Sequence, residues 1–563
     1  MSARRVKVAA AADAPRPGQL AAFTFSGEGD DALKVLVRNV GGTLHATANK
    51  CTHYGAPLEK GCMAADGSVV CPWHGARFGK DGDIEDAPGL SSLRKYAVEQ
   101  DDNGDVYVTA SEDDVKNGHV APEAAAGAQG EGRGLVIVGG GAVGINCLES
   151  ARKNGYTGPI TLLSAEPHAP IDRTKLSKAL IADAGAVEWR KPVHIERALK
   201  ATLRSGTQVR GVDLEQRAVL LDGGESVPYE TLVLGTGGTA RRLPVPGAKE
   251  GELKNVFTLR SLADTKAITE AGIEGKDVVV IGSSFIGIEG AIAMAGKKAK
   301  SVSVVGMEGV PLERVLGEQV GAGLQQALTE NQKLHFYMKA GITKIQGSGA
   351  AESVVIKLDD GSEKTLPAQI VLLGVGVAPA TEFLKDSKGF PALAKDGSVH
   401  VNADLSVKGL EGKGVYAAGD IASTPERTGS GEMRIEHWNV ASNHGRFIGA
   451  ALAGKPESAK FDKIPVFWSA LGAQLRYCSN GNQPTFDSVH VDGDVAKNSF
   501  VATYAKGDTV TAVATMGRDP VMVQCAELLG AGKMPSFAEI KGGKVSIAAR
   551  LDTPPSARAH ASL

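Results

Sequence analysis

Two cysteine–histidine pairs are the residues of this chain best suited to metal or redox chemistry. Cys51 and His53 form a C-x-H pair, and Cys71 and His74 form a C-x-x-H pair after the spacer 54–70. With six cysteines and twelve histidines in 563 residues, this spacing is improbable by chance. Each pair offers one thiolate and one imidazole, which suits a cluster whose two irons are held by two thiolates and by two imidazoles. A structural zinc site is the alternative, although zinc modules usually pair cysteine with cysteine.

The segments beside these pairs favour the iron cluster. Residues 55–58 are Gly-Ala-Pro-Leu, residues 75–78 are Gly-Ala-Arg-Phe, and residues 86–89 are Asp-Ala-Pro-Gly. With the two pairs, they make residues 1–110 resemble a Rieske domain. The resemblance implies a [2Fe–2S] cluster, a loop at 86–89 that covers it, and four ligands: Cys51, His53, Cys71 and His74.

A glycine-rich turn follows the expected strand 135–138. Gly139, Gly141 and Gly144 form G-x-G-x-x-G, and Glu166 follows the next expected strand, 160–163. Glycines in this pattern let the chain turn tightly and let a pyrophosphate approach the backbone at a helix N-terminus. A carboxylate at the position of Glu166 would bind a ribose hydroxyl. The segment therefore predicts a dinucleotide-binding fold.

A second copy of this pattern begins after residue 278. Gly282 and Gly287 keep the outer glycines, Ser284 replaces the middle one, and Glu308 follows the expected strand 301–305. We expect Glu308 to bind ribose. The turn 306–309 has no Arg or Lys for a 2′-phosphate, which favours NADH over NADPH. The apolar run that contains these glycines predicts a strand, a turn and a helix rather than a membrane span.

Together the two folds resemble the flavoprotein reductases that bind FAD in the first fold and NAD(P)H in the inserted second fold. Residues 170–178 resemble the segment of ferredoxin reductases and apoptosis-inducing factors in which an Arg and a Lys contact the flavin, here Arg173 and Lys178. Gly376 lies in a segment like the strand that returns from the NAD fold. Gly419 and Asp420 resemble the second FAD fingerprint, whose Asp bonds the ribityl chain.

The same resemblance suggests catalytic residues. Lys178 and Glu289 resemble a charge pair beside the flavin ring, and His437 and Trp468 lie in segments that resemble those lining the ring. Each has another interpretation. Arg173, Lys178 and Glu289 could be surface charges. His437 could be a core histidine and Trp468 a packing residue.

Nearly the whole chain resembles the apoptosis-inducing factor 3-like family, a Rieske ferredoxin fused to a ferredoxin-reductase-type flavoenzyme. This implies an NAD(P)H-dependent FAD oxidoreductase that passes electrons from NADH through FAD to the [2Fe–2S] cluster. The final acceptor is unidentified, and a protein is one candidate. Two alternatives stay open: a redox-responsive signalling protein of apoptosis-inducing-factor type, and the reductase component of an oxygenase system.

Composition changes along the chain indicate the elements that must position these residues. Short strands separated by Gly, Asp and Asn precede residue 110, and strands alternate with helices after residue 134, which is typical of mainly parallel sheets. The expected parts are an all-β Rieske domain at 1–110, a Gly-, Ala- and charge-rich flexible linker at 111–133, two parts of an FAD-binding domain at 134–258 and 381–459, an NAD(P)H-binding domain at 259–380, and an α+β domain resembling a reductase or dimerisation domain at 460–563.

Composition also excludes some classes of protein. There are 62 basic and 64 acidic residues, for a net charge of −2, which argues against nucleic-acid binding. The N-terminal residues have no apolar core like that of a signal peptide, and we expect a cytoplasmic protein, with mitochondrial association left open. A homodimer is one option for the oligomeric state.

Overall fold

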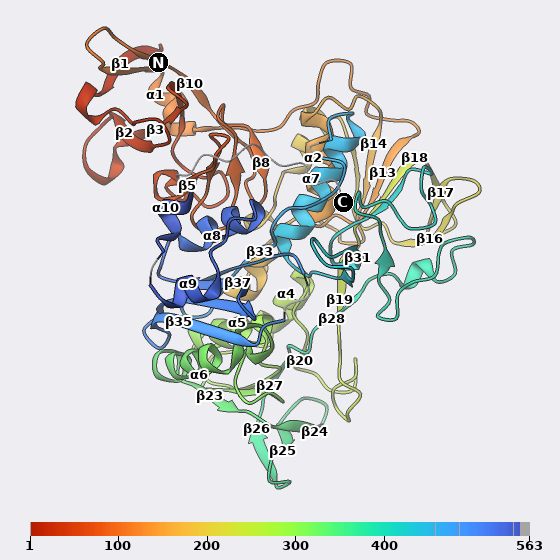
Figure 1. The fold of residues 1–563 in the computed structure, drawn as a ribbon. Helices are drawn as coiled ribbons and strands as arrows, with labels where there is room; N and C mark the ends of the chain where they lie inside the picture. Colours follow the sequence, from red (N-terminus) through yellow and green to blue (C-terminus); the bar gives the residue numbers. More distant parts are fainter. Residues whose placement is uncertain (1, 457, 483–484, 544, 552–563) are drawn as a thin grey trace.

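The computed structural model describes residues 2–456, 458–482, 485–543 and 545–551. Figure 1 shows an N-terminal β domain in red seated on the blue C-terminal helices, with the green second nucleotide fold below and the orange and cyan first fold beside it. The predicted fold class is confirmed: one β domain is followed by two α/β folds and an α+β domain. Among the described residues, no helix is long and apolar enough to cross a bilayer.

The N-terminal domain is built mainly on two antiparallel sheets. Strand β3 is the centre of its core, because Val35, Leu36 and Val37 are all fully buried. The second sheet is smaller, and the loops that carry the cysteine–histidine pairs adjoin it. The larger sheet has the order β1 (Arg4–Ala9), β11 (Val106–Ala110), β10 (Lys95–Gln100), β4 (Thr43–Ala48), β3 (Leu33–Val40) and β2 (Leu20–Ser26). The smaller sheet has the order β5 (Cys62–Met63), β6 (Val69–Val70), β7 (Arg77–Phe78) and β8 (Ile84–Asp86).

Two distant segments build the sheet of the first nucleotide fold. Its parallel strands lie in the order β15 (Thr202–Arg204), β14 (Ile160–Leu163), β13 (Gly134–Val138), β18 (Ser226–Leu234) and β30 (Val415–Ala417), and β17 (Ala218–Leu221) and β16 (Val209–Asp213) extend it antiparallel. Helices α2 (Ala142–Lys153) and α7 (Trp438–Leu452) pack closely on it. A Cβ at Gly445 or Gly449 would lie 2.3 or 2.4 Å from a carbonyl oxygen of α2. These glycines therefore allow the close helix contact.

The second nucleotide fold is a parallel sheet in the order β20 (Val256–Phe257), β27 (Ile370–Leu373), β21 (Asp277–Ile281), β22 (Ser301–Val305) and β23 (Leu334–Tyr337). The apolar run forms β21 and α5 (Phe285–Gly296), as expected. Helices α4 (Leu262–Glu270) and α6 (Glu313–Gln332) belong to this fold, with a small sheet of β24 (Gly341–Gln346), β25 (Ser353–Lys357) and β26 (Glu363–Pro367). Strands β19 (Gly238–Ala240) and β28 (Val377–Pro379) pair where the chain crosses between the folds.

The C-terminal part is an antiparallel sheet in the order β33 (Val466–Ala470), β34 (Gln474–Ser479), β37 (Thr509–Met516), β36 (Ser499–Lys506) and β35 (Ser488–Asp494), with α8 (Val521–Gly530), α9 (Phe537–Lys541) and α10 (Ile547–Leu551). It shares a core with the N-terminal domain. Cys62 and Val70 pack in one cluster with Val466, Cys478 and Cys525. This apolar contact seats the N-terminal domain on the rest of the chain.

The stretch expected to be a flexible linker is partly regular. Helix α1 (Glu112–Asn117) is capped by Ser111, whose hydroxyl accepts from the Asp114 N–H in the first turn. Strand β12 (His119–Val120) pairs with β9 (Ser92–Leu93) of the N-terminal domain. The expectation of a structureless tether was therefore wrong for residues 111–120. Local capping and strand pairing hold this half of the linker against the N-terminal domain.

Candidate redox centres

The two loops with the cysteine–histidine pairs have the same backbone design. The Cys51 N–H donates to the Ala56 carbonyl at 2.8 Å, and the Cys71 N–H donates to the Ala76 carbonyl at 2.8 Å. The glycine before each alanine has a φ of 74° or 75°, which favours glycine. Each turn therefore directs its cysteine and its histidine toward the same side.

The four predicted ligands meet as two pairs in the structure, histidine with histidine and cysteine with cysteine. The Nδ1 atoms of His53 and His74 lie 3.0 Å apart, and the thiols of Cys51 and Cys71 are buried in contact with each other. Burial lowers the pKa of both imidazoles, which favours the neutral form that metal ligation requires. Burial opposes ionisation of Cys71, but its contact with Cys51 and the nearby backbone N–H groups lower the pKa of its thiol. This donor set fits a [2Fe–2S] cluster with two ligands on each iron.

A carboxylate of the first nucleotide fold faces one of these histidines. Asp172 Oδ2 lies 3.7 Å from His53 Nε2, and the hydroxyls of Tyr54 and Thr174 donate to the same carboxylate. Although burial opposes ionisation, His53 and these two hydroxyls lower the pKa of Asp172 to about 2. The sequence comparison includes Asp172 in the flavin-contacting segment but assigns it no role, because nothing local shows that this segment contacts the N-terminal domain.

A cavity of ≈ 990 Å³ runs between the two nucleotide folds and the C-terminal sheet. Most of the predicted site residues lie at its wall: Gly139, Gly141, Glu166, Arg173, Lys178, Glu289, Gly376, Asp420, His437 and Trp468. Five others predicted to bind a dinucleotide lie outside its lining, as do the four predicted cluster ligands: the five are Gly144, Gly282, Gly287, Glu308 and Gly419. The cavity thus gathers most of the residues predicted for the flavin, and of those predicted for the second nucleotide only Gly376 reaches it.

The glycine turn of the first fold is shaped for a phosphate. Gly139 has a φ of 116°, and a Cβ there would lie 2.2 Å from the Gly235 carbonyl oxygen. A Cβ at Gly144 would lie 2.1 Å from the Gly139 carbonyl oxygen, so α2 can approach the turn only without a side chain. Gly141 caps α2 and has no atom within 4 Å of its Cβ position. This open cradle at a helix N-terminus fits the pyrophosphate of FAD.

The second fold repeats the turn. Gly282 has a φ of 107°, and a Cβ there would lie 2.2 Å from the Gly374 carbonyl oxygen. A Cβ at Gly287 would lie 2.1 Å from the Gly282 carbonyl oxygen. Ser284 takes the N-cap position of α5. Losing the middle glycine therefore leaves the geometry of the turn intact, and the cradle fits a second dinucleotide.

Linked charged residues line one part of the cavity. Arg173 forms a two-pronged ion pair with Glu166 at 2.5 and 3.1 Å and donates to the Arg260 carbonyl at 2.7 Å. Arg260 in turn pairs with Asp420 at 2.8 Å. Arg173 is therefore not a solvated loop charge. Sequence reasoning missed Arg260, which precedes α4 outside any motif.

Lys178 and Glu289 form an ion pair across two folds. Their closest atoms are 3.0 Å apart, Lys178 on α3 (Thr174–Ala179) and Glu289 on α5. Glu289 is buried and also accepts from the Ser469 hydroxyl at 2.6 Å and the Ala470 N–H at 3.0 Å. The alternative of two unrelated surface charges is excluded. Glu289 joins both nucleotide folds to the C-terminal sheet.

His437 and Trp468 both line the cavity, and Trp468 lies where the cavity approaches the N-terminal domain. Burial lowers the pKa of His437 to about 4, and its Nδ1 has no hydrogen-bond partner among the described residues. The ring centroid of Trp468 is 4.3 Å from that of His74 and 5.7 Å from that of His53. Trp468 also lines the cavity, so one aromatic ring spans the distance from the cavity to the histidine ligands.

Glu308 lies at the mouth of the second fold. Its carboxylate accepts from the Ser283 hydroxyl at 3.1 Å and pairs with Arg314 at 3.1 Å. The Arg314 side chain is 77% exposed. The turn 306–309 lacks a basic residue, but helix α6 brings Arg314 to it, which the sequence spacing did not show.

Comparisons with known proteins agree with this geometry. The pyridine nucleotide-disulphide oxidoreductase model matches residues 133–445, and the Rieske [2Fe-2S] domain model matches residues 4–97. Apoptosis-inducing factor 3 of Homo sapiens is 36% identical over 518 residues, covering 89% of this chain and 80% of that protein. Putidaredoxin reductase of Pseudomonas putida is 29% identical over 409 residues, covering 70% and 91%.

A solved structure of the covalent putidaredoxin reductase–putidaredoxin complex superposes with a TM-score of 0.66 at 26% identity, covering 74% of this chain and 98% of that one. The matched families show an NAD(P)H- and FAD-dependent oxidoreductase that carries a Rieske [2Fe–2S] domain. The chain therefore belongs to the pyridine nucleotide-disulphide oxidoreductase family, as a Rieske-fused member related to apoptosis-inducing factor 3.

Proposed function

We propose that this enzyme moves electrons from NADH through FAD to the Rieske cluster and on to a one-electron acceptor, and that Trp468 lies on the route. FAD can take a hydride from NADH and release its two electrons singly, and the cluster takes one electron at a time. Each NADH therefore requires the cluster to be emptied twice. The observation that carries the proposal is the position of Trp468, which lines the cavity and lies 4.3 Å from the His74 ring.

The residues take the following roles in this proposal. Lys178 stabilises negative charge on the reduced flavin, and Glu289 holds Lys178 in position. His437 forms part of the wall beside the ring. The cluster ligands are Cys51, His53, Cys71 and His74. FAD is bound by Gly139, Gly141, Gly144, Glu166, Arg173, Gly419 and Asp420, and NADH by Gly282, Gly287, Glu308 and Gly376.

An anaerobic NADH titration of the full-length holoprotein, followed by absorbance and EPR, tests the route. In Cys71→Ser, the cluster signal should disappear while FAD and NADH–ferricyanide activity remain, because these ligands lie outside the flavin cavity. In Trp468→Leu, FAD and the cluster should both remain, but the flavin should reduce the cluster at least tenfold more slowly. Trp468→Phe should retain more of the rate. Loss of FAD in Cys71→Ser, or a wild-type rate in Trp468→Leu, would contradict the proposal.

A further inference from the structure

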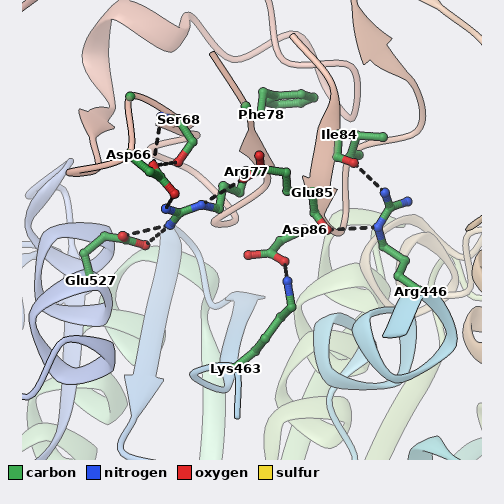
Figure 2. Close-up of polar contacts among 12 residues, drawn as sticks. Asp66, Ser68, Arg77, Phe78, Ile84, Glu85, Asp86, Arg446, Lys463 and Glu527 are labelled. Carbon is green, nitrogen blue, oxygen red and sulfur yellow. Dashed lines mark hydrogen bonds and ion pairs between the residues drawn. The ribbon is translucent and has the colours of Figure 1, made fainter. Parts of the chain in front are cut away.

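Besides the apolar contact through Cys62 and Val70, ionic contacts attach the N-terminal domain to the rest of the chain, here called the flavoprotein body (Figure 2). Arg77 on β7 donates through its Nη1 atom to both carboxylate oxygens of Glu527 on α8, at 2.8 and 2.9 Å. Lys463, just before β33, pairs with Asp86 at the end of β8. Both contacts join residues far apart in the chain and lie beside the loops that carry the cluster ligands.

The Arg77 guanidinium is held in place from its own domain. Asp66 lies 2.8 Å from it and Glu85 3.2 Å, and Ser68 donates to Asp66 (Figure 2). The Arg77 side chain is 17% exposed and that of Glu527 is 23% exposed. A guanidinium fixed in this way meets a carboxylate with little loss of rotamer freedom, which makes the contact specific in its geometry.

Helix α7 binds the loop expected to cover the cluster. Asn439, Asn443 and Arg446 share one helix face. Asn443 Oδ1 accepts from the Ala87 N–H at 2.8 Å, and Asn439 donates to the Ala87 carbonyl at 2.8 Å. Arg446 donates to the Ile84 carbonyl at 2.7 Å (Figure 2). The first residue of α7, Trp438, lines the flavin cavity, so one helix connects the cavity to this loop.

Docking of the N-terminal domain on the flavoprotein body covers the side of the ligand site that carries the two histidines. His53 is 8% exposed and His74 is 6% exposed, and Trp468 and Asp172 lie against them. These two residues come from the flavoprotein body. No external protein can contact the two imidazoles while the N-terminal domain is seated in this position.

We propose that the Arg77–Glu527 and Asp86–Lys463 contacts, here called the latch, hold the Rieske domain as a resident electron acceptor, and that the latch opens when the cluster passes its electron to an external protein. That these two ion pairs dock the domain is inferred from the geometry alone. That the docked domain accepts electrons from the flavin rests on the proposed function. Partly exposed ion pairs suit reversible docking, because their attraction is modest and screened by salt.

The latch is tested by a double variant that keeps the net charge, Glu527→Lys with Lys463→Glu. Each change places like charges together, at Arg77 and at Asp86. In the full-length holoprotein, hydrogen exchange of residues 84–89 should quicken at least tenfold, and the radius of gyration should increase. The matched control is Glu382→Lys with Lys385→Glu, an exposed pair 2.6 Å apart within the body. Unchanged exchange and compactness in the latch variant would overturn the inference.

A conservative variant and a kinetic measurement complete the test. The conservative variant Glu527→Asp with Lys463→Arg keeps both charges and should show the wild-type rate of hydrogen exchange. In anaerobic single turnovers, the latch variant should fill its cluster from the flavin at least tenfold more slowly and empty it faster into cytochrome c, used as a one-electron probe. If the domain opens but the flavin still reduces the cluster at the wild-type rate, the proposed electron route is contradicted while the docking role of the latch is supported. If an opened domain empties no faster, the opening step is overturned.

Discussion

The two nucleotide-binding folds share one turn and differ in what surrounds it. In both, the outer glycines bring backbone atoms to within 2.1–2.2 Å of where a Cβ would lie. In the first fold, the acidic residue Glu166 is paired with Arg173 at the wall of the cavity, which the C-terminal sheet helps to enclose. In the second, Glu308 lies at an open edge, beside Met307, which is 71% exposed, and Arg314.

The difference teaches that the turn alone does not decide how long a nucleotide stays bound. The turn supplies N–H groups and a helix dipole for a pyrophosphate in either fold. A ligand enclosed by several elements leaves only when those elements move, whereas a ligand at an open edge exchanges freely. We therefore expect FAD to stay bound between turnovers and NADH to exchange freely. Four changes test this contrast between the two folds.

The largest effect should come from the matched pair Gly144→Ala and Gly287→Ala. Both add a Cβ 2.1 Å from a carbonyl oxygen, so the helix must move away from its turn. Gly144→Ala should purify without FAD and be inactive. Gly287→Ala should keep FAD and raise the KM for NADH at least tenfold, or about 1.4 kcal/mol. Flavin absorbance and NADH–ferricyanide kinetics measure both, with Gly296→Ala, where the Cβ position is open, as control. A full flavin content in Gly144→Ala would contradict the contrast.

The second change breaks the contact between the folds. Glu289→Ala leaves Lys178 without its ion-pair partner and removes the acceptor of the Ser469 hydroxyl. Breaking such a pair costs about 3 kcal/mol, and since Lys178 is partly exposed the loss should be no larger. Glu289→Gln keeps an acceptor and should lose less, about 1 kcal/mol. The urea midpoint of flavin release measures both. Equal midpoints in the two variants would show that the ionic contact does not join the folds.

The third change concerns acid. His444 Nδ1 accepts from the Gly419 N–H at 3.1 Å, and burial lowers the pKa of His444 to about 3. Because this pKa lies below the unfolded value of about 6.5, the stability that depends on neutral His444 is complete above pH 6.5 and is lost as pH falls toward 3, by about 1.4 kcal/mol per unit.

FAD fluorescence between pH 7 and 4 should therefore report release from the first fold, and His444→Gln, whose amide oxygen can still accept, should shift that release to lower pH. The control is His335→Gln, which changes an exposed histidine on β23 of the second fold. It should leave the release profile unchanged. An identical profile in both variants would remove His444 as the cause.

The smallest effect should be on coenzyme preference. We expect the parent to prefer NADH, because the Glu308 carboxylate would repel a 2′-phosphate. Glu308→Ala removes that repulsion and frees the Arg314 guanidinium, so kcat/KM for NADPH relative to NADH should rise about tenfold. The double variant with Arg314→Ala should lose most of this gain. A parent that prefers NADPH would contradict the assignment of Glu308.

The sequence by itself determined the local chemistry of this protein. Cys51 and Cys71 are each the first residue of a short turn, so their spacing to His53 and His74 already places each pair on one side of a loop. The glycine turns were predictable for the same reason, since a strand, a tight turn and a helix are set by neighbouring residues. The pairing of Lys178 with Glu289 came from resemblance, and the structure places the two in contact.

Only the tertiary structure decided how these sites face one another. Arg77 and Glu527 are 450 residues apart, and Ala87 and Asn443 are 356 apart. Asp172 faces His53 only because two domains dock. Such contacts depend on the rigid placement of whole domains, which leaves no periodicity or spacing in the chain. Residues 111–120 show the same limit, because a composition typical of a linker does not reveal that a neighbouring strand, β9, offers its edge for pairing.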